Sequence, residues 1–208
     1  MEFARLSCNS KLETLNLKLK IGLFGGSFDP VHLGHLLVVQ AAREELGLDR
    51  LFFIPAAQSP FKPENHAAAG RERLRLLRLA LAGQTWCEVD AQELQRGGIS
   101  YTVDTVRDYA GRFPGAEIFY LIGADNVAKL PLWREAAELA RLAEFAVIPR
   151  PGQVAVSFPA PFRGRWLKGF PLGVSSSQIR ARIKAGLTVD HLVPTAVVEA
   201  LRNNPLYL

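Results

Sequence analysis

Short apolar runs alternate along this chain with longer segments in which apolar residues recur every three or four positions. Runs of the first kind predict buried strands, and segments of the second kind predict amphipathic helices. A proline- and glycine-rich segment, 149–171, predicts an irregular excursion with one short strand. The predicted strands are residues 17–24, 50–55, 86–89, 117–122 and 145–148, and the predicted helices are 33–46, 71–82, 101–113 and 133–142.

Strands that alternate with helices predict an α/β fold with a doubly wound parallel sheet, because parallel neighbours need a crossover that is normally a right-handed helix. In such sheets ligands bind beyond the carboxyl ends of the strands, where the winding reverses. If the first and fourth predicted strands are central neighbours, Gly25 and Gly26 face the same crevice as residues 123–125. The pattern by itself leaves the order of the strands open.

The first predicted strand leads through two adjacent glycines into a helix. Gly25 and Gly26 let the main chain approach a ligand closely, and the unpaired N–H groups at the start of the following helix attract an anion. Asp29 and Pro30 suit the entry to that helix. We therefore predict that this junction holds phosphate.

Two histidines stand at the start of this helix. His32 and His35 are three positions apart, which on a helix places both imidazoles on one face of the first turn, and Gly34 between them keeps that face uncrowded. A glycine pair is often only a turn, and a histidine near a helix end is often a surface residue. The combination of strand, turn, helix start and two histidines favours two donors that converge on one phosphate.

A second helix start with the same chemistry lies further along the chain. Ser175, Ser176 and Ser177 precede a helical pattern that ends at Gly186. Serine is an ordinary N-cap residue, so capping alone can explain this cluster. Arg180, one turn into the helix, can swing toward an anion bound at the same N-terminus. Beside the first junction, this segment predicts the second side of a phosphate site.

The composition fits one globular domain with anionic ligands. Of 208 residues, 49% are hydrophobic and 22% are charged, which suffices for a sizeable core. The formal net charge is +5, but Lys and Arg form neither a block nor a stripe interleaved with aromatic residues, so small phosphate-bearing molecules are expected rather than nucleic acid. Cys8 and Cys87 lack the spacing of a metal site or a disulfide framework, and a reducing cytoplasm is the expected compartment.

The beginning of the sequence is interpreted as a short extension. Residues 1–18 mix charged with apolar side chains and lack the continuous apolar centre of a signal peptide. No later run of about 18 uncharged apolar residues predicts a membrane span, so no membrane partner is expected. We expect one domain over residues 19–208 and leave open whether it forms a homo-oligomer.

The junction from Gly25 to His35 resembles the nucleotidyltransferase superfamily, in which a glycine-rich turn and His-x-Gly-His hold a nucleoside triphosphate. Residues 175–180 resemble its second signature, with serine at a position where one branch has threonine. The resemblance implies a Rossmann-like nucleotidyltransferase fold with a small C-terminal helical part. It implies catalytic roles for His32, His35 and Arg180, and ATP phosphate binding by Gly25, Gly26, Ser27, Phe28, Lys62, Ser175, Ser176, Ser177 and Ile179.

The segments between these signatures are similar to the family of bacterial nicotinate-mononucleotide adenylyltransferases. Residues 59–63 resemble a loop of that family with Lys62 at its basic position, although Phe61 replaces the family's histidine. A solvated loop lysine is the plain alternative for Lys62. Residues 100–105 resemble Ser-Tyr-Thr-x-Asp-Thr, which implies that Thr102 and the nearby backbone bind the nicotinate carboxylate. The alternative for Thr102 is an ordinary N-cap.

Two further segments match the same family. Gly123 and Asp125 resemble its Gly-x-Asp turn, which implies contact with a nucleotide ribose, and a helix cap is the alternative for Asp125. Residues 130–134 resemble Leu-x-x-Trp, whose indole stacks on the pyridine ring. The residues implied to bind nicotinate mononucleotide are Tyr101, Thr102, Trp133 and Arg134.

The resemblance implies an enzyme of NAD biosynthesis that joins ATP and nicotinate mononucleotide to give nicotinate adenine dinucleotide and pyrophosphate. Because the attacking phosphate is already an anion, no general base is required, and the sequence suggests no Ser-His-Asp set. Mg²⁺ is the implied cofactor, bound mainly through the ATP phosphates rather than by a protein metal site. Nicotinamide mononucleotide or pantetheine phosphate as second substrate, and a sensor without turnover, are the open alternatives.

Overall fold

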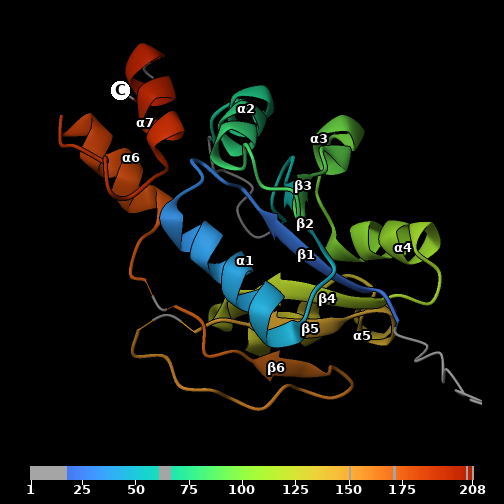
Figure 1. Ribbon diagram of the computed structural model, residues 1–208. Helices are drawn as coiled ribbons and strands as arrows, with labels where there is room; N and C mark the ends of the chain where they lie inside the picture. Colours follow the sequence, from blue (N-terminus) through green and yellow to red (C-terminus); the bar gives the residue numbers. More distant parts are fainter. Residues whose placement is uncertain (1–17, 61–66, 150, 171, 205, 208) are drawn as a thin grey trace, which may run out of the picture.

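A six-stranded sheet forms the centre of the protein in the computed structural model, which describes residues 18–60, 67–149, 151–170, 172–204, 206 and 207. Neighbouring strands run parallel, in the order β3-β2-β1-β4-β5-β6 (Figure 1). The predicted doubly wound α/β fold is confirmed. The strands are β1 (Lys20–Gly26), β2 (Arg50–Pro55), β3 (Cys87–Val89), β4 (Glu117–Ile122), β5 (Glu144–Val147) and β6 (Gly164–Trp166).

Helices cover both faces of the sheet, because successive side chains of a strand point to opposite sides. Leu51 and Phe53 of β2 belong to one buried cluster, and Phe52 and Ile54 belong to the other. The first cluster includes residues of α1 (Leu33–Leu46), α2 (Gly70–Ala80), α6 (Ser176–Lys184) and α7 (Thr195–Asn203). The second includes residues of α4 (Thr102–Arg112), the 3₁₀ helix η1 (Ala124–Leu132) and α5 (Ala136–Leu142).

The winding of the sheet reverses at β1, which lies between β2 and β4. Its last two residues, Gly25 and Gly26, pair with Ile54 and Pro55 of β2, while its first half pairs with β4. The helix that follows β1, α1, packs on one face of the sheet, whereas α4, η1 and α5, which flank β4 in the sequence, pack on the other face. The structure thus decides the strand order that the sequence left open: the first and fourth strands are central neighbours, and a ligand crevice is expected at their carboxyl ends.

Most element bounds lie within one or two residues of the prediction, and α1, β2 and β4 match it fully. One difference matters for the site: the two glycines are still part of β1, whereas the prediction ended the strand at Phe24. Neither α3 (Gln92–Arg96) nor α7 was predicted; α3, with five residues, has too few turns to show a helical period. Residues 1–17 of the expected extension and Lys62 lie outside the described residues.

The predicted helix 133–142 is wrong at its start. Residues Ala124–Leu132 form the 3₁₀ helix instead, Trp133 is extended, and the α-helix begins only at Ala136. Trp133 is the C-cap of η1, and its extended backbone, with φ −74° and ψ 148°, excludes it from a helical turn. Glu135 then adopts a left-handed φ of 50°, which turns the chain into α5.

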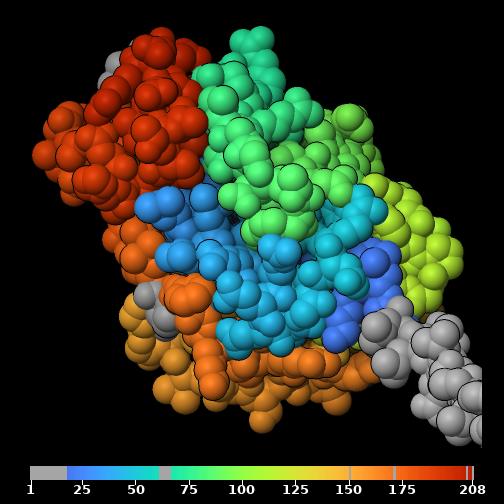
Figure 2. All heavy atoms as spheres, in the orientation of Figure 1, coloured from blue at the N-terminus to red at the C-terminus, as the bar shows by residue number. Residues whose placement is uncertain are grey.

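The small helical part that was expected near the C-terminus consists of α6 and α7. Figures 1 and 2 show both beside α1 and α2 at one end of the molecule. The N–H of Leu33, the first residue of α1, donates to the carbonyl of Leu192 at 2.9 Å, which joins the two parts. In the described part of the chain no helix combines the length and the apolar character that crossing a membrane requires.

Candidate functional site

A cavity of about 730 Å³ opens at the carboxyl ends of β1 and β4. It brings together the junction after β1, the start of α6 and the segment after β4, three regions that are far apart in the sequence. The arrangement predicted for the two phosphate segments, on two sides of one site, is therefore present. Its lining includes Gly25, Gly26, Ser27, Phe28, Asp29, His32, His35, Gly123, Asp125, Ser175, Ser176, Ser177 and Arg180.

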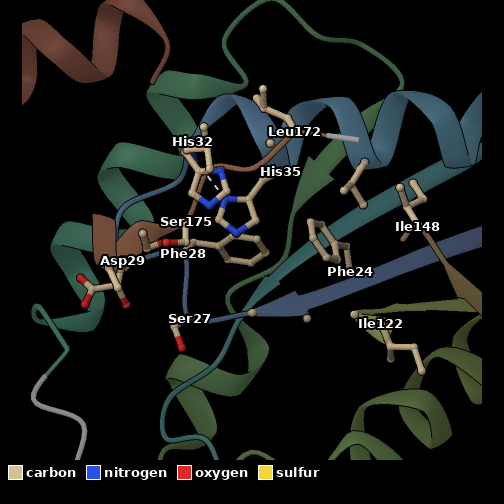
Figure 3. Close-up of a pocket in the computed structure, with 18 of the residues that line it drawn as sticks. Phe24, Ser27, Phe28, Asp29, His32, His35, Ile122, Ile148, Leu172 and Ser175 are labelled. Atoms are coloured by element: carbon tan, nitrogen blue, oxygen red, sulfur yellow. Dashed lines mark hydrogen bonds between the residues drawn. The ribbon is translucent and has the colours of Figure 1, made fainter. Parts of the chain in front are cut away.

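The two histidines lie side by side in this cavity (Figure 3). The prediction placed both on the first helical turn, but His32 is the extended N-cap residue, with φ −145° and ψ 169°. The two rings nevertheless stack, with centroids 3.6 Å apart and planes inclined by 26°. A Cβ at Gly34 would lie 3.0 Å from the His32 ring, a tight contact that agrees with the interpretation that Gly34 keeps this face uncrowded.

A backbone hydrogen bond sets the orientation of His35. The N–H of His32 donates to Nδ1 of His35 at 3.1 Å. A nitrogen that accepts a hydrogen bond carries no proton, so the neutral ring holds its proton on Nε2 and can donate from there. The contact therefore makes His35 a directed donor at the cavity wall.

Two phenylalanines support the imidazole of His35 from below in Figure 3. The ring of Phe28 lies edge-on to it, with centroids 5.1 Å apart, and the ring of Phe24 lies 5.9 Å away. Phe28 is 1% exposed and has a left-handed φ of 47°, which is rare for a bulky residue. Because such strained conformations are retained mainly where the surroundings enforce them, this turn belongs to the architecture of the site. Ser27, Asp29 and Pro30 lie in the turn before α1, whose first residue is Leu33.

Close packing explains why β1 ends in glycine. A Cβ at Gly25 would lie 2.2 Å from the hydroxyl oxygen of Tyr120, and one at Gly26 would lie 3.1 Å from the Phe28 ring. The absence of both Cβ atoms also leaves the main chain open to the cavity that they line. The glycine pair therefore serves the packing beneath the site as well as access to it.

The serines at the start of α6 have three different environments. Ser175 is the N-cap: its hydroxyl accepts from the N–H of Gln178 at 3.3 Å, so the capping interpretation is correct for this residue. The Ser176 hydroxyl donates to the carbonyl of Pro30 at 2.9 Å and ties α6 to the junction after β1. Ser177 is exposed and lies 3.3 Å from Nη2 of Arg180. All three serines belong to the cavity lining.

Arg180 reaches across the cavity to the other motif. Its Nη1 donates to the main-chain carbonyl of Asp29 at 2.7 Å and lies 3.7 Å from the Asp29 carboxylate. Ile179 beside it is fully buried among the residues that pack α6 against the sheet, and its N–H donates to the carbonyl of Ser175. The structure therefore brings Arg180 to the cavity and places the Ile179 side chain in the core.

The residues predicted to meet the second substrate form a neighbouring group outside the cavity lining. Tyr101 is the N-cap of α4 and Thr102 is its first residue, so the interpretation of Thr102 as N-cap is wrong by one position. The guanidinium of Arg134 lies 4.6 Å from the centre of the Tyr101 ring and 3.8 Å from the carboxylate of Asp104. Trp133 packs edge-on against Tyr120 from the same side.

Tyr120 connects the two groups. Its hydroxyl lies beneath Gly25 and hydrogen-bonds to Thr102, and its ring contacts Trp133. Burial raises the pKa of this hydroxyl above its ordinary value. Gly123 and Asp125 belong to the cavity lining. Gly123 is the N-cap of η1, so the interpretation of Asp125 as the helix cap is wrong.

Sequence reasoning missed buried ionic groups behind the site and apolar groups at its rim. Asp29 was named only as part of a helix entry, and Arg73 only as part of an amphipathic pattern, yet they are 2% and 3% exposed. Burial lowers the pKa of Arg73, and the charge of Asp29 opposes that shift. Val38, Ile148, Phe170 and Leu172 line the apolar part of the cavity. No local signal marks these residues, because they meet only in the folded chain.

Metal binding by the protein itself was not expected. Among the described residues, no group of three or more His, Cys, Asp and Glu is arranged to hold a metal ion.

Comparison with known proteins assigns the family. The sequence model of the Cytidylyltransferase-like family matches residues 23–182. The chain is 41% identical over 192 residues to a protein of Opitutus terrae named "probable nicotinate-nucleotide adenylyltransferase", covering 91% of this chain and 98% of that protein. The chain belongs to the nicotinate-nucleotide adenylyltransferase family. A protein of Geobacillus kaustophilus with the same name is 38% identical over 188 residues, which is 90% of this chain and 86% of that protein.

The fold of the family extends to a remote relative of known structure. Plasmodium falciparum nicotinic acid mononucleotide adenylyltransferase, complexed with NaAD, superposes with a TM-score of 0.73 at 15% identity. The match covers 91% of this chain and 97% of that one. The Rossmann-like nucleotidyltransferase fold is thereby confirmed.

Proposed function

We propose that this member of the nicotinate-nucleotide adenylyltransferase family transfers the adenylyl group of ATP to nicotinate mononucleotide, a step of NAD biosynthesis. The observation that carries the proposal is the cavity at the β1–β4 boundary, where His32, His35 and Arg180 gather from two helix starts. Sequence identity of 41% to a relative of this name, over nearly the whole chain, supports the same reaction.

The reaction needs positioning more than acid–base chemistry. A phosphate oxygen of nicotinate mononucleotide forms a bond to the α-phosphorus of ATP, the bond to the bridging oxygen of the β-phosphate breaks, and pyrophosphate leaves with the electron pair. The nucleophile is already ionised, so no residue has to remove a proton. Catalysis then comes from holding two polyanions in line and from donors that offset the charge growing on the leaving group.

In this proposal the triphosphate lies between the two motifs. His35 donates from Nε2, His32 lies against it, and Gly25 and Gly26 allow the main chain to approach the phosphates. Arg180 faces them from α6 as a planar cation that suits phosphate oxygens, and Ser176 and Ser177 lie at the same helix start. We infer that Mg²⁺ enters as part of the ATP complex, held by phosphate oxygens and water.

The second substrate is assigned to the group around Tyr120. Thr102 lies at the N-terminus of α4, where the helix dipole favours a carboxylate such as that of nicotinate. Trp133 offers an aromatic surface for the pyridine ring, and Tyr101 and Arg134 lie beside it. Asp125 and Gly123, at the edge of the cavity, are the proposed contacts of a ribose.

One assay tests the proposal. The protein is incubated with ATP, Mg²⁺ and, in separate reactions, nicotinate mononucleotide, nicotinamide mononucleotide or pantetheine phosphate, and pyrophosphate release is measured. Release that depends on nicotinate mononucleotide and exceeds the other two is expected. Preference for another acceptor would change the assigned substrate, and saturable ATP binding without release from any acceptor would show a nucleotide sensor instead of an enzyme.

A further inference from the structure

A buried carboxylate in the cavity wall has no role in the reaction described above. Asp29 is 2% exposed, and its Oδ1 accepts from the hydroxyl of Tyr207 at 2.8 Å and from the N–H of Ala68 at 3.2 Å. Taking a carboxylate out of water is costly unless hydrogen bonds and opposite charges compensate it. Since Tyr207 lies 178 positions further along the chain, this contact is a specific product of the fold.

The partners of Asp29 come from both sides of the triphosphate cavity. Its main-chain carbonyl accepts from Nη1 of Arg180 at 2.7 Å, and its Oδ2 lies 3.7 Å from the same nitrogen. Arg180 is thus held by the same residue that Tyr207 holds from behind. The other end of the Arg180 guanidinium, Nη2, lies 3.3 Å from the Ser177 hydroxyl at the start of α6.

A second buried cation stiffens the main chain around this carboxylate. Arg73 is 3% exposed and donates to the carbonyls of Ser27, Ala56 and Ala68 at 2.7, 2.8 and 2.9 Å. The Ser27 carbonyl lies two residues before Asp29, and the N–H of Ala68 donates to the Asp29 carboxylate. With the backbone fixed in this way, the Asp29 carboxylate links the Tyr207 hydroxyl, which donates to Oδ1, to Arg180, which lies 3.7 Å from Oδ2.

We propose that Tyr207 is a positioning residue of the triphosphate site, which orients Arg180 through Asp29. Tyr207 itself is buried and does not line the cavity, so it acts on the site only through Asp29. Removing the Tyr207 hydroxyl leaves the Asp29 carboxylate with one fewer donor, so the carboxylate can rotate, and the Arg180 guanidinium that it faces at 3.7 Å can shift with it. A misplacement of about 1 Å can cost on the order of 100-fold in rate.

The chain offers a matched control for this hydroxyl. Tyr109 is also buried, and its hydroxyl donates to the carboxylate of Asp90 at 2.7 Å, but neither residue lines the cavity. Tyr207→Phe and Tyr109→Phe therefore remove the same kind of hydrogen bond. Both variants are expected to lower the urea midpoint of unfolding by similar amounts, which measures their structural effect.

Only Tyr207→Phe is expected to affect function specifically. Its kcat for pyrophosphate release should fall by about 10- to 100-fold and its Kd for Mg²⁺-ATP should rise, while the KM for nicotinate mononucleotide stays unchanged. Because the effect passes through Arg180, Tyr207→Phe should cost less than twofold further in an Arg180→Ala background. Equal kinetic losses in Tyr207→Phe and Tyr109→Phe, or full losses in the Arg180→Ala background, would overturn the proposal.

Two further measurements keep the test decisive. Asp29→Asn retains an oxygen for the Tyr207 hydroxyl but removes the charge that faces Arg180, so it should reproduce the loss of kcat even if Tyr207→Phe fails to fold. Normal kcat in folded Asp29→Asn would count against the role. The turnover readout rests on the proposed function; if the wild-type protein binds ATP without releasing pyrophosphate, that function fails, and the Kd for ATP in the same variants still decides this inference.

Discussion

The imidazole of His35 accepts a hydrogen bond from the backbone N–H of His32 while the two rings stack 3.6 Å apart. The bond to Nδ1 leaves the ring proton on Nε2, and the stacking prevents the ring from rotating away. The cavity therefore contains an imidazole whose donor direction is determined before any ligand arrives. Such preorganised donors stabilise developing charge without reorganisation during the reaction.

Substitution of His35 tests this donor. We expect His35→Ala to lower kcat by about 100- to 1,000-fold, the usual cost of removing one preorganised donor to a developing anion. His191→Ala is the control, because His191 is exposed and does not line the cavity. Circular dichroism and the urea midpoint check the fold of both variants, and turnover of His35→Ala close to that of the control would rule out the role.

Gly25 and Tyr120 form a pair whose packing can be tested by a double-mutant cycle. Gly25→Ala should destabilise the protein by about 1–3 kcal/mol, since its Cβ would lie 2.2 Å from the Tyr120 hydroxyl oxygen. In a Tyr120→Phe background the cost should be smaller, because the next atom lies at 3.2 Å. Gly111→Ala in α4 is the control: a Cβ there meets nothing within 4 Å, and we expect a gain of roughly 0.5–1 kcal/mol. Urea unfolding measures all four variants, and additive costs would contradict the contact.

Trp133 should act on one substrate only. Trp133→Ala is expected to raise the KM for nicotinate mononucleotide roughly tenfold, the loss of about 1.4 kcal/mol of stacking, with a much smaller change for ATP. The control is Trp86→Ala, because Trp86 lies against Arg43 on the opposite face of the sheet and outside the nucleotide cavity. Steady-state kinetics with each substrate varied separately decide the point, and equal changes in both KM values would contradict stacking on the pyridine ring.

The buried thiol of Cys87 gives a prediction about pH. Burial raises its pKa from 9.0 to about 11. At pH 8 its thiolate fraction is therefore about 100-fold smaller in the folded protein than in the unfolded chain, since each pKa unit is a factor of ten. In a Cys8→Ser variant, reaction with a thiol reagent at pH 8 should be at least about 100-fold slower in buffer than in denaturant.

The same pKa shift makes stability depend on pH with a definite sign. Between pH 9 and 11 the unfolded chain loses this proton first, so it binds fewer protons than the folded protein and the free energy of unfolding falls as pH rises. The stability that the protonated Cys87 thiol contributes is fully present below pH 9. The stability difference between the wild type and Cys87→Ala should therefore shrink over this range, and a constant difference would contradict the shift.

Local patterns in the sequence were enough to predict most of the strands and helices. Residues close together in the sequence were also enough to predict the two motifs at 25–35 and 175–180 as phosphate-binding candidates. The apolar runs 50–55 and 117–122 could be identified as strands because a doubly covered parallel strand is continuously apolar. His32, Gly34 and His35 could be assigned together because they are close in sequence, although His32 is the extended N-cap and not part of the first turn. These inferences needed no knowledge of the rest of the chain.

Tertiary structure alone decided which motifs face each other and what stands behind them. The order of β1 and β4 places Gly25 over Tyr120, and this contact joins the cavity to the group of Thr102 and Trp133. The contact between Asp29 and Tyr207 spans 178 positions, so no periodicity could have revealed it. The local sequence determined that His32 and His35 stand together at one helix start. The fold decided which residues meet Asp29, because a buried carboxylate must be hydrogen-bonded and its donors come from distant parts of the chain.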